Sequence, residues 1–324
     1  MKKHDRELAI LRMIYDEKKF ASVQHQDRPD FLLRHHGAST NFGVEVTELY
    51  QTESDARANN RPGYIGQLLA GGRYMHKDDT KTLSISTVKI QDSEGNLKAD
   101  NVSAIIRQQP SERQRSQAIA EVVHRKNEKA DGYLEGLDHV NLIIMDHFGL
   151  KHEPDSEYSV SRLLTSGLRP ALLETRFREV FLISTLSDGR KIYRPLQMLL
   201  LVERFQLFIE AINSCDAISS AIELNDIVPL FVRQMNRSGM CVELASHVND
   251  FQCAIYRGAG IFHTGEMTEI LDFYDMDLPS ALPLPPVPVN PETMAIFEKG
   301  YEKLIQKNGF VTPLVMDVVE ESDL

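Results

Sequence analysis

The fold of this chain is constrained most by two compact apolar runs, Val140–Met145 and Val180–Ser184. Both runs are too short for helices and are typical of strands that are buried on both faces of a sheet. Segments with helical periodicity precede and separate them. Because a sheet buried on both faces needs helices on both sides, the pattern predicts an α/β fold with a mixed central sheet flanked by helices.

Two earlier segments, at 29–34 and 42–50, also have the pattern of strands. In the second, Val44 and Val46 alternate with Glu45, so the valines lie on one face and the glutamate on the other. The connection between the two segments is short. Short connections favour antiparallel neighbours, so we expect these strands to pair in that way.

Helical periodicity marks a segment from Asp5 to about Phe20 and another from about Ser111 to Ala130. Ser111 follows a proline and is a suitable N-cap for the second helix. Each segment has an apolar stripe that a sheet can bury. The members of the first stripe are Leu8, Leu11, Ile14 and Tyr15, and those of the second are Ile119, Val122, Val123, Ala130 and Tyr133.

Asp30 and Glu45 belong to the two early strands. A carboxylate that projects from a hydrophobic strand is costly to bury unless a cation or a hydrogen-bond donor compensates it. Two such acids can share one metal ion. The ordinary alternative is that Asp30 is a turn residue and Glu45 an exposed strand residue.

The segments Pro29-Asp30 and Glu45-Val46-Thr47 resemble the active-site signature of the PD-(D/E)xK nuclease superfamily, over about the first half of the chain. The resemblance implies a restriction-endonuclease-like core. It also implies that Asp30, Glu45 and the carbonyl of Val46 bind Mg²⁺ or Mn²⁺. Thr47 stands where the family usually has its lysine. Relatives with a displaced lysine carry it on a following helix, so a lysine from elsewhere is expected here.

Lys126 is the candidate for that lysine, because it projects into the apolar stripe of the second helix. Lys129 lies at the edge of the same stripe. Glu7, on the first helix, matches an acid that the family often places near its metal. Each has an ordinary alternative: both lysines can extend along the core surface to water, and Glu7 can be a first-turn acid favoured by the helix dipole.

The resemblance implies metal-dependent hydrolysis of phosphodiester bonds in nucleic acid, as by a DNA endonuclease. Thr47 and the formal net charge of −11 suggest an alternative, a catalytically inactive nuclease-fold interaction or regulatory module. A third possibility is a nuclease that stays silent until its C-terminal half binds a ligand or partner. Motifs for acyl transfer (GxSxG), for NTP hydrolysis (a Walker-type loop) and for zinc proteases (HExxH) are absent from the sequence.

The sequence divides into a nuclease-like core at 1–195, with an insertion at about 51–110, and a mainly helical region at 196–324. The insertion can be a surface excursion with a hairpin or a substrate contact. A long buried helix is expected at about 196–212, and an extended proline-rich strap at 277–290. The last helix follows the strap, and its apolar positions can dock on the body or on a second subunit, which leaves a homodimer open.

The composition limits the class of protein. The chain has 324 residues, of which 42% are hydrophobic, so it can bury a large core. The net charge argues against nonspecific coating of nucleic acid but allows a locally basic groove. Three cysteines without metal-ligand spacing favour reduced thiols in a cytoplasmic protein. No apolar run approaches the ~20 residues that cross a bilayer, and no signal peptide opens the chain, so no membrane partner is expected.

Overall fold

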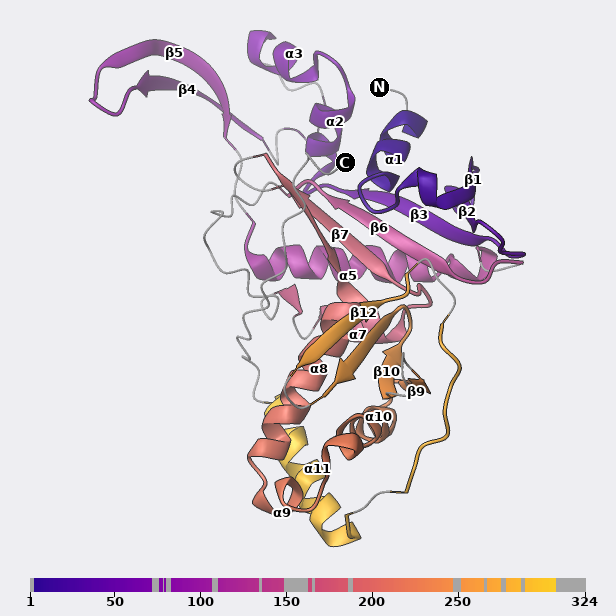
Figure 1. Cartoon of the computed structure of the whole chain (residues 1–324). Helices are drawn as coiled ribbons and strands as arrows, with labels where there is room; N and C mark the ends of the chain where they lie inside the picture. Colours follow the sequence, from indigo (N-terminus) through magenta and orange to yellow (C-terminus); the bar gives the residue numbers. More distant parts are fainter. Residues whose placement is uncertain are drawn as a thin grey trace.

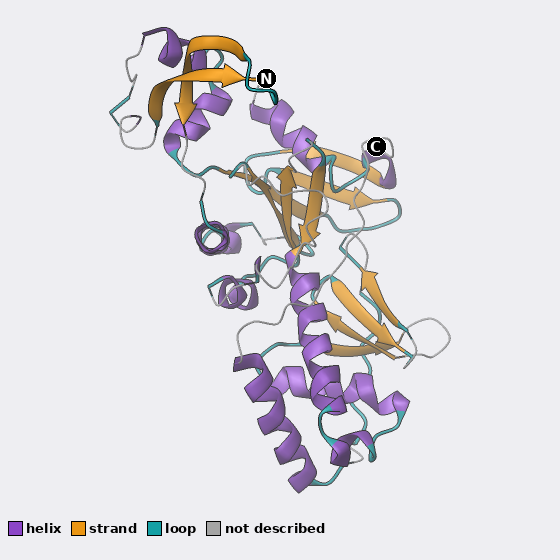
Figure 2. Ribbon diagram, turned by 90° about the vertical axis from the view of Figure 1, so that its left-hand side faces the viewer, coloured by secondary structure: helices purple, strands orange, loops and turns teal. Residues whose placement is uncertain are grey.

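A computed structural model describes most of the chain. It covers residues 3–71, 76–77, 79, 83–106, 110–133, 136–148, 163–164, 167–185, 189–246, 252–264, 267–274, 278–286 and 289–306. The insertion lies at one end of the molecule and the C-terminal region at the other, with a six-stranded sheet between them (Figures 1 and 2).

The central sheet has the strand order β1-β2-β3-β6-β7-β8. The first three strands form an antiparallel meander, β3, β6 and β7 are parallel, and β8 is antiparallel to β7. The sheet is therefore mixed, as expected, and the two apolar runs are its central parallel strands. The strands are β1 (Phe20–His25), β2 (Phe31–His35), β3 (Phe42–Leu49), β6 (Val140–Asp146), β7 (Val180–Thr185) and β8 (Lys191–Pro195).

Helices cover both faces of this sheet (Figure 1). One face carries α1 (Lys3–Leu11), and the other carries α5 (Glu112–Asn127) and α7 (Leu168–Glu174). The helix α5 begins with the expected N-cap: the Ser111 side chain accepts from the backbone of Gln114, and the Gln114 side chain accepts from the backbone of Ser111. This capping box fixes where α5 begins and hence which of its residues face the sheet.

The first helix is shorter than the sequence predicts. It ends at Leu11, and the segment to Phe20 contains a 3₁₀ helix, Glu17–Lys19, which the Asp16 side chain caps. Strand β1, which the sequence analysis did not anticipate, then forms a hairpin with β2. Pairing with β2 satisfies the β1 backbone, a tertiary contact that the periodicity of the segment does not reveal.

The insertion forms a separate small unit at the end of β3. It contains α2 (Glu53–Asn60), α3 (Tyr64–Gly71) and a hairpin of β4 (Ser84–Gln91) and β5 (Leu97–Ile106). The expected hairpin is therefore present, together with two helices. The unit has its own hydrophobic cluster, built on Tyr64, Leu68 and Leu83. It projects from the core (Figure 1).

The C-terminal region is helical, as expected, but it also contains a four-stranded antiparallel sheet of order β12-β11-β10-β9. The periodicity of the sequence did not predict this sheet. The helices are α8 (Leu196–Asn213), α9 (Asp216–Ser219), α10 (Ile227–Arg237) and α11 (Pro291–Gln306). The strands are β9 (Glu243–Ser246), β10 (Gln252–Tyr256), β11 (Ala259–His263) and β12 (Thr268–Asp272), and short 3₁₀ helices occupy Ala130–Gly132 and Leu224–Asp226.

One hydrophobic cluster runs from the central sheet into the C-terminal region. It includes Phe181 of β7 and Phe208 of α8, and it reaches Phe297 of α11. The last helix therefore packs on the body of the same chain, and a homodimer stays a prediction. The strap at 277–290, of which 278–286 and 289–290 are described, contains no helix and touches β9 through an Ala245–Ala281 bridge.

The helices within the described residues include none whose length and apolar character would let it span a membrane.

Candidate functional site

The two predicted acids lie side by side in the sheet. Phe31 of β2 pairs with Val44 of β3, so extending this register by one residue places Asp30 opposite Glu45. Residues directly opposite each other on antiparallel strands project from the same face. Both side chains are buried. The Asp30 Oδ2 atom accepts a hydrogen bond of 2.8 Å from the backbone N–H of Val46, which fixes its orientation.

Lys126 reaches the acids from α5. Its Nζ atom donates to Glu45 Oε1 at 2.6 Å, and the exposed fractions of the two side chains are 17% and 6%. The helix places Lys126 here because Ile119, Val122 and Val123 are buried on the same side of α5. The structure thus brings together Asp30, Glu45 and Lys126 from three elements.

Tyr133 is a fourth member of this cluster, and the sequence analysis counted it only as an apolar core residue. Its hydroxyl donates to Glu45 Oε1 at 3.3 Å, and its ring is buried. In the structure α5 ends at Asn127, and Tyr133 follows the 3₁₀ helix Ala130–Gly132. It stands seven residues after Lys126, a spacing that puts two side chains on one face of a continuous helix. That spacing, together with the polar end of its ring, was the available signal.

The cluster is crowded with negative charge. Burial, and next the charge of the neighbouring Glu45, raise the pKa of Asp30 to about 6, although the Val46 N–H and Lys126 oppose this shift. Burial and the charge of Glu45 likewise raise the pKa of Tyr133 to about 12, so its hydroxyl keeps its proton. The second oxygen of Glu45, Oε2, is buried and has no hydrogen-bond partner among the described residues. An additional cation at Glu45 would compensate this atom.

The backbone of Val46 adds an oxygen to the same place. The N–H and the carbonyl of one residue in an extended strand face the same neighbour. Since the Val46 N–H points to Asp30, the Val46 carbonyl also faces the acid side.

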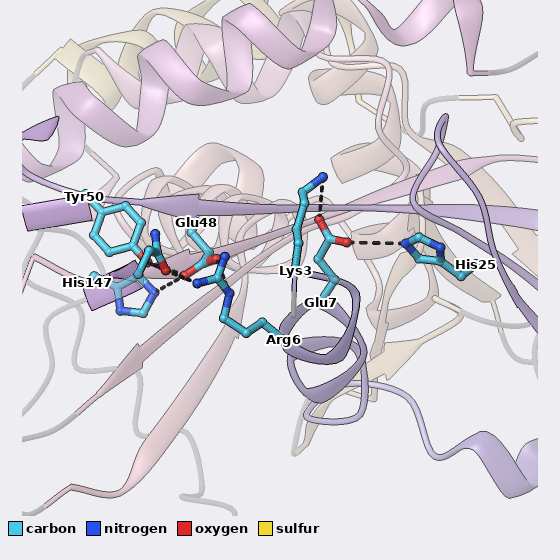
Figure 3. A network of polar contacts seen from close by, with 8 residues as sticks. Lys3, Arg6, Glu7, His25, Glu48, Tyr50 and His147 are labelled. Carbon is cyan, nitrogen blue, oxygen red and sulfur yellow. Dashed lines mark hydrogen bonds and ion pairs between the residues drawn. The ribbon is translucent and has the colours of Figure 1, made fainter. Parts of the chain in front are cut away.

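Glu7 is buried near the acids but is bound to other residues. Its Oε1 pairs with Lys3 Nζ at 3.0 Å, and its Oε2 lies 3.4 Å from His25 Nε2 (Figure 3). Its charge contributes to the raised pKa of Asp30. No three histidine, cysteine, aspartate or glutamate side chains in the described part of the chain are grouped so that they could hold a metal. A metal here would therefore use two carboxylates and a carbonyl, with Glu7 outside its contacts.

The other predicted lysine lies apart from this cluster. Lys129 is exposed and follows the end of α5, where it precedes the 3₁₀ helix Ala130–Gly132. Thr47, two residues after Glu45 on β3, is half-buried. Of the cations that the sequence singled out for catalysis, Lys126 alone contacts an acid of the pair in the described structure.

A second polar network lies on the opposite face of β3. Glu48 is three residues after Glu45, so its side chain points to the α1 side of the sheet, where it lies 3.6 Å from Arg6 Nε. Its Oε2 atom is 3.0 Å from His147 Nε2 and also accepts from Tyr50, whose ring stacks on His147 (Figure 3). The hydrogen bond from His147 is the main cause of a lowered pKa for Glu48. This network joins α1, β3 and the end of β6.

Comparisons with known proteins give no match for this chain among family models, curated proteins or solved structures. The geometry of the site and the motif in the sequence are therefore the features that bear on function.

Proposed function

We propose that this protein is a metal-dependent nuclease with a restriction-endonuclease-like core, and that it cleaves DNA as an endonuclease. The observation that carries the proposal is the convergence of Lys126 on Glu45, at 2.6 Å, beside the opposed carboxylate of Asp30. The order of elements is consistent with such a core: helix α1, the meander β1–β3, helix α5, strand β6, helix α7 and strand β7.

The residues of the site fit a divalent cation. The Oε2 atom of Glu45 has no hydrogen-bond partner among the described residues, and the pKa of Asp30 is raised. An added positive charge would bind that oxygen and lower that pKa. Asp30, Glu45 and the Val46 carbonyl would hold Mg²⁺ or Mn²⁺, because hard cations prefer oxygen ligands. Once bound, the cation supplies positive charge to the attacking water and to a phosphate oxygen.

The remaining residues of the cluster have roles that follow from their contacts. Lys126 is buried except for 17% of its side chain, so its ammonium group is held at the acids and can orient a water or balance charge on the phosphate. Tyr133 donates to the same oxygen of Glu45 and positions that carboxylate. Free thiols at Cys215, Cys241 and Cys253 fit a cytoplasmic enzyme, and we include that location in the proposal.

A cleavage assay tests this proposal. Purified protein is incubated with plasmid DNA, and separately with RNA, in Mg²⁺ or Mn²⁺. We expect divalent-dependent cleavage that Glu45→Gln and Lys126→Met each lower by about 100-fold or more, because each removes a group at the reacting phosphate. Exposed Lys129→Met and Glu292→Gln are the matched controls and should retain activity. Equal cleavage by wild type and Glu45→Gln would reject the mechanism.

The Lys126–Glu45 pair also favours a second candidate, an inactive nuclease-fold interaction module. In this protein the lysine already compensates one oxygen of Glu45, and an ion pair of this kind can replace a metal in a scaffold that has lost its chemistry. Calorimetric titration with Mn²⁺ separates the candidates. Binding that Asp30→Asn abolishes supports the enzyme, and no binding by the wild-type protein supports the module.

A further inference from the structure

A pocket of about 440 Å³ lies where the insertion meets α1. Its wall is the end of α2, the turn at 60–63 and the start of α3, and Arg6 of α1 also lines it. Sites for small molecules and cofactors generally measure about 300–1,000 Å³, so the pocket is large enough for a nucleotide.

The charges that line the pocket are all positive. Arg6 and Arg61 both line it, and the lining residues include no carboxylate. Arg61 is exposed and contacts His76 at 3.1 Å, and no acid among the described residues forms an ion pair with it. Arg6 donates to Asn60 and forms an ion pair of 3.6 Å with Glu48, which offsets part of its charge but does not line the pocket. In a chain of net charge −11, two guanidinium groups at one pocket favour an anionic ligand.

The other lining residues suit the rest of a nucleotide. The Asn59 amide nitrogen donates to the Asp55 carbonyl, and the Asn60 amide oxygen accepts from Arg6 and Tyr50. The Asn59 oxygen and the Asn60 nitrogen can therefore contact a base edge. Ile65 has 41% of its surface exposed although it is apolar, so it offers a face for a base or a sugar. Such a combination of guanidinium, amide and apolar surface is typical of contacts to nucleic acid.

A buried aspartate holds the pocket in shape. Asp79 accepts hydrogen bonds from Ser54 of α2, from Tyr64 of α3 and from the backbone of His76, and it also pairs with Arg57. These contacts tie the two helices together on the side away from solvent. A wall that is ordered before binding loses less entropy when a ligand arrives.

The pocket and the acid site share two elements. On α1, Arg6 lines the pocket while its neighbour Glu7 lies near Asp30. On β3, Glu45 belongs to the acid site, and Glu48, three residues later on the opposite face of the sheet, contacts Arg6 of the pocket.

We propose that the pocket lined by Arg6, Asn60, Arg61 and Ile65 binds one nucleotide unit of the nucleic-acid substrate through its phosphate. The substrate assignment rests on the proposed function. The phosphate contacts at the pocket position the nucleic-acid strand relative to Asp30 and Glu45, and the metal site cuts that strand.

Binding measurements in a Glu45→Gln background test the pocket without cleavage. A fluorescein-labelled DNA oligonucleotide is titrated with protein, and anisotropy is followed over a range of salt concentrations. Arg61→Glu should weaken binding by about tenfold and reduce the salt dependence by about one phosphate contact. Lys299→Glu, the same charge reversal at an exposed position of α11, should bind like the parent. Equal affinity and salt dependence for Arg61→Glu and Lys299→Glu would overturn the proposal.

Two further comparisons complete the test. If adenosine monophosphate binds in an Arg61-dependent way while binding of the oligonucleotide does not depend on Arg61, the pocket serves a free nucleotide and the substrate contact is refuted.

Cleavage by the protein with Glu45 intact is measured in parallel. Arg61-dependent binding without any Glu45-dependent cleavage supports the pocket and rejects hydrolysis. Glu45-dependent cleavage with Arg61-independent binding supports hydrolysis and rejects the pocket.

Discussion

The ionised form of the Asp30 carboxyl group is destabilised in the folded protein. Burial comes first among the causes of its raised pKa, and Glu45 adds to it. The same acid accepts the Val46 N–H, which holds it in place although its ionised form is disfavoured. Sites that bind cations commonly have this property, because the cation restores the energy that the clustered carboxylates lose.

The raised pKa predicts a pH-dependent stability. The folded-state pKa of Asp30 is about 6, above the ordinary 3.8, so the folded protein binds this proton more tightly than the unfolded chain does. The contribution to stability is full below about pH 3.8 and is lost as the pH rises through 6. Asp30→Asn keeps an oxygen for the Val46 N–H but removes the charge. We expect it to raise the free energy of unfolding by about 1–2 kcal/mol at pH 8.

The check is thermal unfolding of wild type and Asp30→Asn at pH 8 and pH 3.5 without divalent cations. The gain at pH 8 should disappear at pH 3.5, where the wild-type carboxyl is also neutral. Asp27→Asn, at an exposed position in the same turn, is the control. A gain of the same size at both pH values would show that charge at Asp30 is not the cause.

Helix α5 depends on a buried ion pair at its N-terminal end for its position on the sheet. Arg115 Nε lies 2.6 Å from Asp146 Oδ2 at the end of β6, and Arg115 also donates to Ser184 of β7 at 2.8 Å. The side chains of Arg115 and Asp146 are each only 3% exposed. Lys126 is eleven residues further along, so this anchor determines whether its amine reaches Glu45.

Replacing Arg115 with methionine leaves the Asp146 carboxylate buried without its cation. Such a loss costs about 3 kcal/mol or more, so we expect Arg115→Met to lower the unfolding temperature and the cleavage rate together. The double variant Arg115→Met with Asp146→Leu removes both charges and should recover part of the stability. Chemical denaturation of the four proteins of this cycle measures the coupling. Additive losses in the double variant would show that the pair does not act as a unit.

The C-terminal region belongs to the same hydrophobic core as the central sheet. Helix α8 is buried along almost its whole length. At its start, Gln197 and Met198 donate their backbone N–H groups to Glu179, a fully buried acid beside β7, at 2.7 and 3.2 Å. Burial raises the pKa of Glu179 to about 8, although these donors oppose the shift. The boundary at residue 195 therefore separates two parts of the chain but not two cores.

We accordingly expect residues 1–195 alone to lack a cooperative thermal transition, because removing α8 exposes the apolar surface of the sheet. The matched control replaces the hairpin at 84–106 with a short glycine-serine linker. That deletion removes strands that pack only in the separate cluster of the insertion, so the main transition should remain. Circular dichroism and calorimetry measure both variants. A native-like transition for residues 1–195 would establish the C-terminal region as an independent domain.

The sequence alone determined the central strands β6 and β7, the antiparallel pairing of β2 with β3, the capped helix α5 and the pair of acids. Periodicity and local capping fix which face of an element a side chain occupies. The sequence missed β1 and the C-terminal sheet, and it gave α1 too great a length, because these depend on which strands are available as partners. Only the tertiary structure showed that Lys126 rather than Lys129 contacts Glu45, that Tyr133 shares that oxygen, and that Arg6 and Arg61 line one pocket. The physical reason is that a sequence pattern gives the direction of a side chain relative to its own element, while its neighbours come from residues far along the chain.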